Sequence, residues 1–231
     1  MKPVIVAFSL LFAASIPVAS PCFATDAGAI SQVNGNVTII GADKSQRKAS
    51  ARDKIQSGDT ITTDTRGEAM IKMADDSTVV LRPSTQFQFT DFKFESKPTD
   101  TSVFSILRGT ARMISGLIGR NSPSRFSVVA TTATIGIRGT DFEVAVVTED
   151  TPQARAGVYN LVHDGGTNVK IASGQSVQVN KAQTAFAPEK PNPGEDPLQL
   201  LRETPVFLQQ GGGLDALIQS LTIPMAPIMI R

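Results

Sequence analysis

The chain has 231 residues, of which 41% are hydrophobic, and its formal net charge is +1. This length allows one domain with a substantial core, and the balanced charge argues against a basic surface for nucleic acid or an anionic membrane. The chain has no tryptophan and one tyrosine, Tyr159, which argues against extensive ring stacking on sugars or bases.

Residues 1–24 have the pattern of a secretory signal peptide. Lys2 gives a positive start, residues 4–18 are mostly apolar, and Cys22-Phe23-Ala24 provides small residues before a cleavage site after Ala24. The apolar stretch is shorter than the roughly 20 residues of a spanning helix, so an uncleaved anchor is the weaker alternative. We therefore expect no membrane span in the mature chain.

Cleavage after Ala24 would remove the only cysteine, Cys22. A mature chain without thiols excludes cysteine nucleophiles and thiolate metal sites, and its core alone must hold it together. Cleavage would also remove Lys2 and no acidic residue, so basic and acidic residues would then be equal in number.

Residues 29–185 predict β-strands throughout. Short apolar runs alternate with Gly, Asn, Asp and Ser at about every 8–12 residues, which is typical of sandwiches, jelly rolls and short β-solenoids. The fold class is therefore all-β, a single domain of short antiparallel strands. The apolar runs are residues 33–40, 69–73, 78–81, 86–94, 103–113, 125–130, 132–147, 158–162, 168–171 and 176–179.

Turn residues and alternation add detail to this pattern. We expect hairpins at residues 74–77 and 163–167, and a turn at Asn34-Gly35. Residues 86–94 alternate polar side chains with phenylalanines, so this strand is expected to bury one aromatic face.

The C-terminal part has a different composition. Residues 187–197 contain four prolines and mixed charge, which predicts a linker. Residues 198–231 predict a short helical tail, because Leu214, Leu217, Ile218 and Leu221 have helical spacing. The apolar end of the tail is too short to span a bilayer, and we expect it to pack on the β-domain or on a partner.

Two short patterns occur twice. Residues 55–61 and 171–177 both read I-x-S-G-x-[TS]-[IV], and Arg108-Gly109-Thr110 has a counterpart in Arg138-Gly139-Thr140. Two copies can reflect either a repeated strand-turn unit or common turn chemistry.

Residues 132–146 (TATIGIRGTDFEVAV) place two glycines, an arginine and two acids among β-forming apolar residues. This segment resembles the most specific motif of the FecR domain family, periplasmic β-domains named for an iron-citrate signal transducer. The resemblance extends from about Gly58 to Val179 and includes residues 58–69, 75–81, 107–112 and 174–177. It implies structural roles for Ile135, Gly136, Arg138, Gly139, Thr140 and Phe142.

Members of that family that signal have a cytoplasmic domain that controls a sigma factor, followed by a membrane span. This chain has only Met1-Lys2 before its apolar run, so we expect a stand-alone exported version of the sensing domain. The resemblance then implies a periplasmic or secreted protein of a Gram-negative bacterium, with a protein of the cell envelope as its partner.

The candidate chemical groups all have simpler structural interpretations. His163, the only histidine, precedes Asp164-Gly165-Gly166 and is better interpreted as a turn residue than as part of a catalytic or metal site. Asp75 and Asp76 could bind a hard cation, but a hairpin turn explains them better. The sequence therefore predicts no metal and no cofactor.

Asp141 and Glu143 lie on one face of a predicted strand and could act as a carboxylate pair on a sugar. Ion pairing with Arg138 or Arg112 is the simpler interpretation. Arg138 lies between Ile137 and Gly139 in an apolar segment, so we hypothesise that it is partly buried and joins strands through an acid or backbone carbonyls.

These observations favour a non-enzymatic module of the cell envelope that senses or binds a protein, with edge-strand pairing as the mode of contact. A structural or glycan-binding role at the cell wall is the alternative, and a hydrolase using Asp141 and Glu143 is a third hypothesis. The sequence does not determine the oligomeric state.

Overall fold

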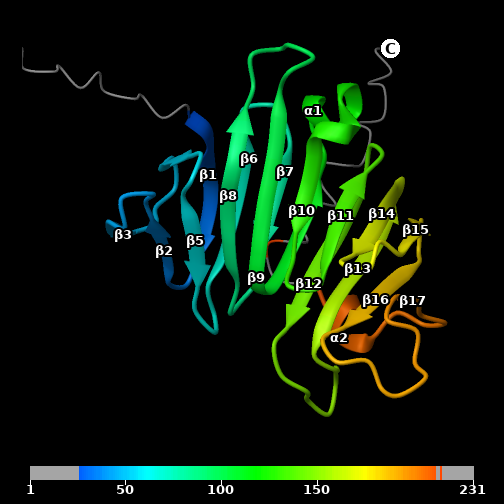
Figure 1. Cartoon of the computed structure of the whole chain (residues 1–231). Helices are drawn as coiled ribbons and strands as arrows, with labels where there is room; N and C mark the ends of the chain where they lie inside the picture. Colours follow the sequence, from blue (N-terminus) through cyan, green and yellow to red (C-terminus); the bar gives the residue numbers. More distant parts are fainter. Residues whose placement is uncertain (1–25, 212–213, 215–231) are drawn as a thin grey trace, which may run out of the picture.

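The structure is a computed structural model that describes residues 26–211 and 214 (Figure 1). The predicted signal peptide and most of the predicted tail lie outside these residues. Within them, the chain forms 17 strands and short helical segments, α1 (Leu117–Asn121), the 3-10 turn η1 (Pro123–Arg125) and α2 (Val206–Gln209). The predicted all-β class is confirmed.

The strands form two sheets that share one long strand, β9 (Thr101–Ile114). In the first sheet, the order around β9 is β4 (Lys54–Gln56), β1 (Asp26–Asn34), β6 (Glu68–Met73), β7 (Thr78–Leu81), β9, β12 (Asp141–Val147), β13 (Gly157–Asp164), β16 (Thr184–Pro188) and β17 (Gln199–Leu200).

The second sheet is built in the same way around the other half of β9. Its order is β3 (Gln46–Lys48), β2 (Val37–Ile40), β5 (Thr60–Thr63), β8 (Gln86–Lys93), β9, β10 (Phe126–Val129), β11 (Ala133–Ile137), β14 (Gly166–Ile171) and β15 (Ser176–Asn180). Its β9–β10 pair is parallel, which is an exception to the predicted antiparallel pairing.

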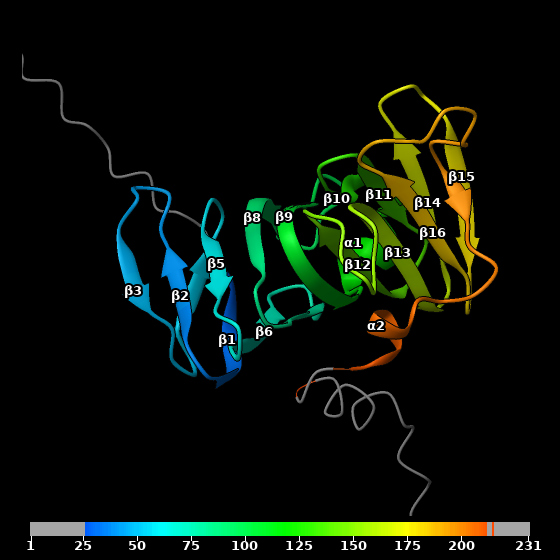
Figure 2. The same cartoon turned by 90° about the horizontal axis from the view of Figure 1, so that it is seen from below.

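The two sheets pack face to face over one hydrophobic core, and Figure 2 shows the strands of both layers along the molecule. Aromatic rings form a continuous row in this core, with centroid distances of 5.3 to 6.2 Å, from Phe87 and Phe89 through Phe104 and Phe126 to Phe142. The predicted aromatic face of β8 is confirmed, because Phe87, Phe89 and Phe92 are buried and Phe94 is partly buried against the core.

The chain repeatedly crosses from one sheet to the other. We call the residues that make each crossing a corner, and several corners contain a residue with positive φ. These residues include Gly35, Gly58, Ser84, Gly109, Gly139, Gly165 and Ala182. The two Arg-Gly-Thr sequences mark equivalent corners, since each glycine lies where the chain leaves the second sheet and enters the first. The short repeat is therefore explained by corner geometry.

The two corner glycines have different surroundings. A side chain at Gly109 would clash with Thr85, whose Cα would lie 2.5 Å from the added Cβ, whereas no atom lies within 4 Å of a Cβ at Gly139. Gly109 thus meets both a backbone and a packing requirement, and Gly139 meets only the backbone requirement.

One predicted hairpin is confirmed and one is wrong. Residues 74–77 join the antiparallel pair β6–β7. Residues 163–167 do not close a hairpin, because β13 pairs with β12 and β16 in the first sheet, whereas β14 pairs with β11 and β15 in the second. Asn34-Gly35 is a turn, but it joins β1 of the first sheet to β2 of the second.

The residues after β16 pass across the outer face of the first sheet. Leu208 of α2 packs with Tyr159, Leu161 and Phe186, and Leu214 packs with Met70 and Val80. We call residues 198–211 and Leu214 the C-terminal strap. In the part of the chain that the structure describes, no helix has the length and apolar character needed to cross a membrane.

Candidate functional site

The outer face of the first sheet has charged residues between two apolar clusters. The strand registers place Arg112 beside Val80 on one side and beside Glu143 on the other, and Glu143 beside Leu161. Val80 belongs to the cluster under Leu214, and Leu161 to the cluster under Leu208. The centre of this face is therefore ionic and lies between the two places where the strap packs on the sheet.

Glu143 is the most buried charge of the face, with 0% of its side chain exposed. Arg82 Nη2 donates a hydrogen bond of 2.9 Å to Glu143 Oε2, and Arg82 Nη1 lies 2.8 Å from Oε1 in an ion contact without hydrogen-bond alignment. His163 Nε2 lies 3.3 Å from Oε2. A carboxylate this deeply buried requires such partners, because an unpaired buried charge is very costly.

Arg112 and Asp141 form a second ion pair on this face. Arg112 Nε donates to Asp141 Oδ1 at 3.0 Å and Arg112 Nη2 donates to Oδ2 at 2.8 Å, so the contact is bidentate. About one tenth of each side chain is exposed. This geometry is the strong form of arginine–carboxylate pairing, and it joins β9 to β12.

Two open cavities lie beside these ion pairs, and His163 lines both. One has a volume of about 540 Å³ and is lined by Arg112, Arg120, Gly139, Thr140, Asp141 and Asp164. The other has a volume of about 620 Å³ and lies between β13 and the strap, where Lys181, Glu203 and Leu208 contribute. Gly139 and Thr140, which lie between β11 and β12, therefore border the first of these cavities, the one lined by more charged side chains.

The predicted motif residues meet at this corner. Ile135 and Phe142 are fully buried in the core, and Gly136 pairs with Asn168 of β14. Thr140 is buried and anchors the corner: its N–H donates to Ser115 Oγ at 2.8 Å and its hydroxyl donates to Gly166 O at 2.7 Å. Gly139 supplies the positive φ of 64°.

Residues 59–178 match the family described as FecR protein. The chain belongs to the FecR family. No curated protein matches it in sequence. In fold it is similar to two crystal structures of a candidate anti-sigma factor from Parabacteroides distasonis ATCC 8503, each with a TM-score of 0.50 and 14% sequence identity. The similarity covers 65% of this chain and 62% of that chain, so this FecR protein spans less than two thirds of that relative.

Members of the FecR family act in signal transduction together with partner proteins. The similarity to the solved structures shows the shared fold, because their identity to this chain is low. The family match covers both Arg-Gly-Thr corners, the strands β5 to β14 and the ion-paired residues Arg82, Arg112, Asp141 and Glu143.

The hypothesis that Arg138 is buried is wrong. The residue is exposed, and only its backbone N–H is held, donating to Gly166 O at 3.0 Å. The corner rotates residue 138 out of the apolar strand that precedes it. Among the described residues, the buried guanidinium groups belong to Arg82 and Arg112, and of these two the sequence predicts an ion pair only for Arg112.

Arg82 was missed because its partner lies 61 residues away in the sequence. The one local signal is that Arg82 lies two residues after Val80, so both side chains point to the same face of an apolar strand. The sequence predicts ion pairing of Asp141 and Glu143 with Arg138 or Arg112. Asp141 does pair with Arg112, whereas Glu143 pairs with Arg82.

His163 and Asp75, the other two candidate residues from the sequence, both contact neighbouring residues of the fold. His163 lies in β13, which ends at Asp164, and only Gly165, with a positive φ, lies between β13 and β14. Asp75 is 0% exposed; it accepts hydrogen bonds from Ser77 N at 3.0 Å and from Ile118 N at 3.2 Å, and so links the β6–β7 hairpin to α1. Among the described residues, no group of three or more metal-ligating side chains is present.

Proposed function

We propose that this FecR protein is an exported, non-enzymatic module of the cell envelope that senses or relays a signal by binding a partner protein along β15. Its family supports a signalling role with partner proteins. The observation that carries the mode of binding is the edge of the second sheet at β15, which pairs with β14 and with no other strand of the described residues.

Each sheet has two edges, and three of the four edge strands are short. Strands β3 and β4 have three residues each and contain lysine, and β17 has two residues. Short strands and lysine are common protection against unwanted pairing. Strand β15 has five residues, Ser176-Val177-Gln178-Val179-Asn180, and none of them is charged.

The hydrogen-bond pattern shows which backbone groups of β15 point outward. Ile171 N donates to Gln175 O at 3.0 Å, and the register pairs Val169 with Val177. Because bonded and non-bonded pairs alternate in an antiparallel ladder, residues 176 and 178 direct their N–H and C=O groups away from β14. An extended segment of a partner protein can use these groups to add a strand.

A proline at residue 178 tests this directly. Gln178→Pro removes an outward N–H without breaking the β14–β15 ladder, so the fold should be retained. The full mature protein, carrying a photo-cross-linker at Asn180, would be exposed to envelope extract, with Gln178→Ala as the matched control.

We expect a defined protein adduct with the wild-type protein and with Gln178→Ala, and its loss with Gln178→Pro. Equal recovery of the adduct with Gln178→Pro would refute binding at this edge. Failure to recover any protein adduct would refute the proposed partner binding itself.

A further inference from the structure

The cavity of about 540 Å³ lies where α1, the corner before β12 and the end of β13 meet. Its volume is in the usual range for a site that binds a small molecule. Arg120 of α1 lines it, as do Asp141 of β12 and, from a third element, His163 and Asp164 of β13. No atom lies within 4 Å of a Cβ at Gly139, so the corner leaves the space beside it open.

The carboxylates in the wall of this cavity already have cationic partners. Asp141 accepts two hydrogen bonds from Arg112, and Lys181 Nζ lies 3.0 Å from Asp164 Oδ1. The hydrogen bond from Lys181 lowers the pKa of Asp164 from its ordinary value, so this carboxyl group is ionised at neutral pH. These acidic groups are therefore balanced by Arg112 and Lys181, and the charge of Arg120 is left over.

The guanidinium group of Arg120 has no carboxylate partner in the part of the chain that the structure describes. Its side chain makes one long hydrogen bond there, 3.5 Å from Nη1 to Ser115 O, and the residue is exposed. A guanidinium group binds a carboxylate through two parallel hydrogen bonds, which is one of the strongest polar contacts in proteins. The cavity therefore has a position for an anionic group at Arg120.

His163 and Asp164 have the opposite chemistry. Because the ionised carboxylate of Glu143 only accepts hydrogen bonds, His163 Nε2, 3.3 Å from Glu143 Oε2, carries the proton of the neutral ring. His163 Nδ1 is then an acceptor. The side chain of Asp164 is 73% exposed and has room for a further donor besides Lys181. This end of the cavity therefore suits an ammonium group.

The strand registers give the distance that a ligand has to bridge. Asp164, Asp141 and Ile114 lie in one row across β13, β12 and β9. With about 4.8 Å between neighbouring strands, the row is roughly 10 Å wide. Arg120 follows Ile114 in the chain, after the end of β9. An extended peptide of two or three residues spans about 7–10 Å, whereas a single amino acid is too short.

We propose that this cavity binds a short peptide of two or three residues with free termini. Its C-terminal carboxylate pairs with Arg120, and its N-terminal ammonium group is bound by His163 Nδ1 and Asp164. An internal segment of a protein chain has neither terminal charge, so it does not fit the two ends of the cavity. The site is separate from the β15 edge and does not depend on it.

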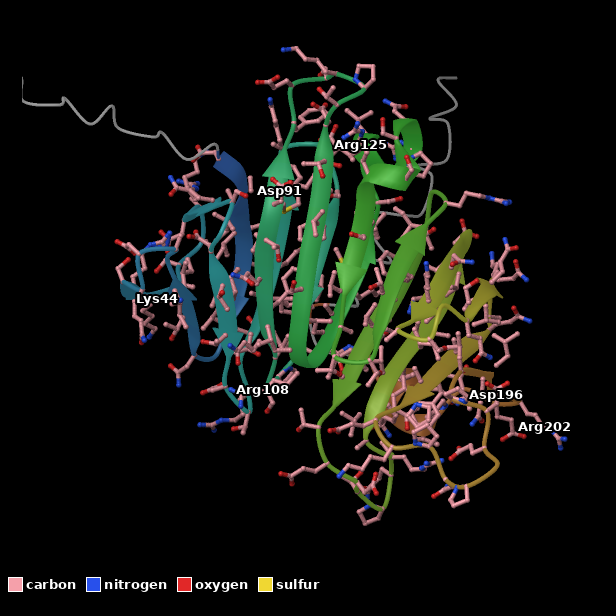
Figure 3. All side chains as sticks on the ribbon, viewed as in Figure 1. Lys44, Asp91, Arg108, Arg125, Asp196 and Arg202 are labelled. Carbon is pink, nitrogen blue, oxygen red and sulfur yellow. The ribbon has the colours of Figure 1, made fainter. Side chains whose placement is uncertain are left out.

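An NMR chemical-shift titration of the full mature protein tests the proposal, with dialanine and trialanine as probes because their side chains add no charge. N-acetyl-dialanine lacks the ammonium group, dialanine amide lacks the carboxylate, and free alanine and acetate are shorter ligands. The variants are Arg120→Gln and Asp164→Asn. Arg125→Gln and Asp91→Asn are the matched controls, since both residues are exposed, lie outside the cavity wall and are labelled in Figure 3.

We expect saturable shifts of the backbone signals of Gly139, Thr140 and His163 with dialanine or trialanine. The dissociation constant should rise at least about fivefold in Arg120→Gln and in Asp164→Asn, because each removes a charge-assisted contact, and should not change in the two controls. The two blocked peptides should bind the wild-type protein more weakly by a similar factor, which tests both termini without any substitution.

Absence of saturable shifts with both free peptides would overturn the proposal. Equal binding of the blocked and free peptides, or unchanged affinity in a folded Arg120→Gln variant, would also overturn it. Equal affinity for free alanine or acetate would indicate a site for a single amino acid or for a carboxylate alone, which contradicts the proposed peptide. None of these results changes the cross-linking outcome at β15, so the two proposals can fail separately.

Discussion

Removing the Arg82 guanidinium should strongly destabilise this FecR protein. Glu143 has no exposed side-chain surface, and Arg82 provides both the 2.9 Å hydrogen bond and the 2.8 Å ion contact that compensate its charge. Loss of one partner of a buried ion pair costs about 3–5 kcal/mol. In a domain of this size, each kcal/mol lowers the Tm by about 2–4 °C, so Arg82→Met should lower it by about 6–20 °C.

The measurement is urea unfolding followed by circular dichroism for Arg82→Met, Glu143→Leu and the double variant. The double variant should recover most of the lost free energy of unfolding, because replacing both charges with apolar groups is often close to neutral. Arg138→Met provides the control, since it makes the same substitution at an exposed arginine.

A loss of less than about 1 kcal/mol in Arg82→Met would refute the reasoning, because it would mean that Glu143 is stabilised without this arginine. A double variant as unstable as the worse single variant would also contradict it. In that case, the cost would arise from packing and not from an uncompensated charge.

Three further outcomes follow from the structure. Gly139→Ala should cost about 1–2 kcal/mol for its positive φ alone, whereas Gly109→Ala should cost clearly more in the same unfolding assay because its Cβ also has no space. Arg138→Met should change the free energy of unfolding by less than about 0.5 kcal/mol, and a larger loss would show that its side chain has a structural role. Hydrogen bonds from Arg155 lower the pKa of Glu195 to about 2 from its ordinary value of 4.5, so the stability that this carboxylate contributes is complete above pH 4.5 and lost as the pH falls toward 2. A carboxyl NMR titration should show this midpoint, and Arg155→Gln should raise it; an unchanged midpoint would contradict the assignment.

The local pattern of this chain predicted many of its strands, whereas β3, β4, β5 and β16 lie outside the predicted apolar runs. The alternation in β8 requires one buried face wherever that strand is placed, and its phenylalanines are indeed in the core. Likewise, the Ala74–Ser77 turn lies between two strands that are close in sequence, so the hairpin that it forms depends on local chemistry. The FecR motif could also be recognised from its residues, and Gly139 and Thr140 do lie together at one corner.

The pairing between the sheets was not predictable in this way. Residues 163–167 have the composition of a hairpin turn, but the chain uses them to move from the first sheet to the second. A glycine-rich turn permits either path, and the choice depends on which sheet can bury β14. The two Arg-Gly-Thr corners show the same limit, since their common role is visible only once both sheets are formed.

The candidate site depends on long-range contacts that the sequence did not predict. Composition and alternation by themselves determined an all-β chain with one core, and the motif determined its family. Only the tertiary structure decided that Arg138 points to solvent while Arg82 reaches Glu143 across 61 residues of sequence, and that residues of α1, β12 and β13 line one cavity. The physical reason is that alternation fixes which side of a strand each residue occupies, whereas burial and partners depend on long-range packing.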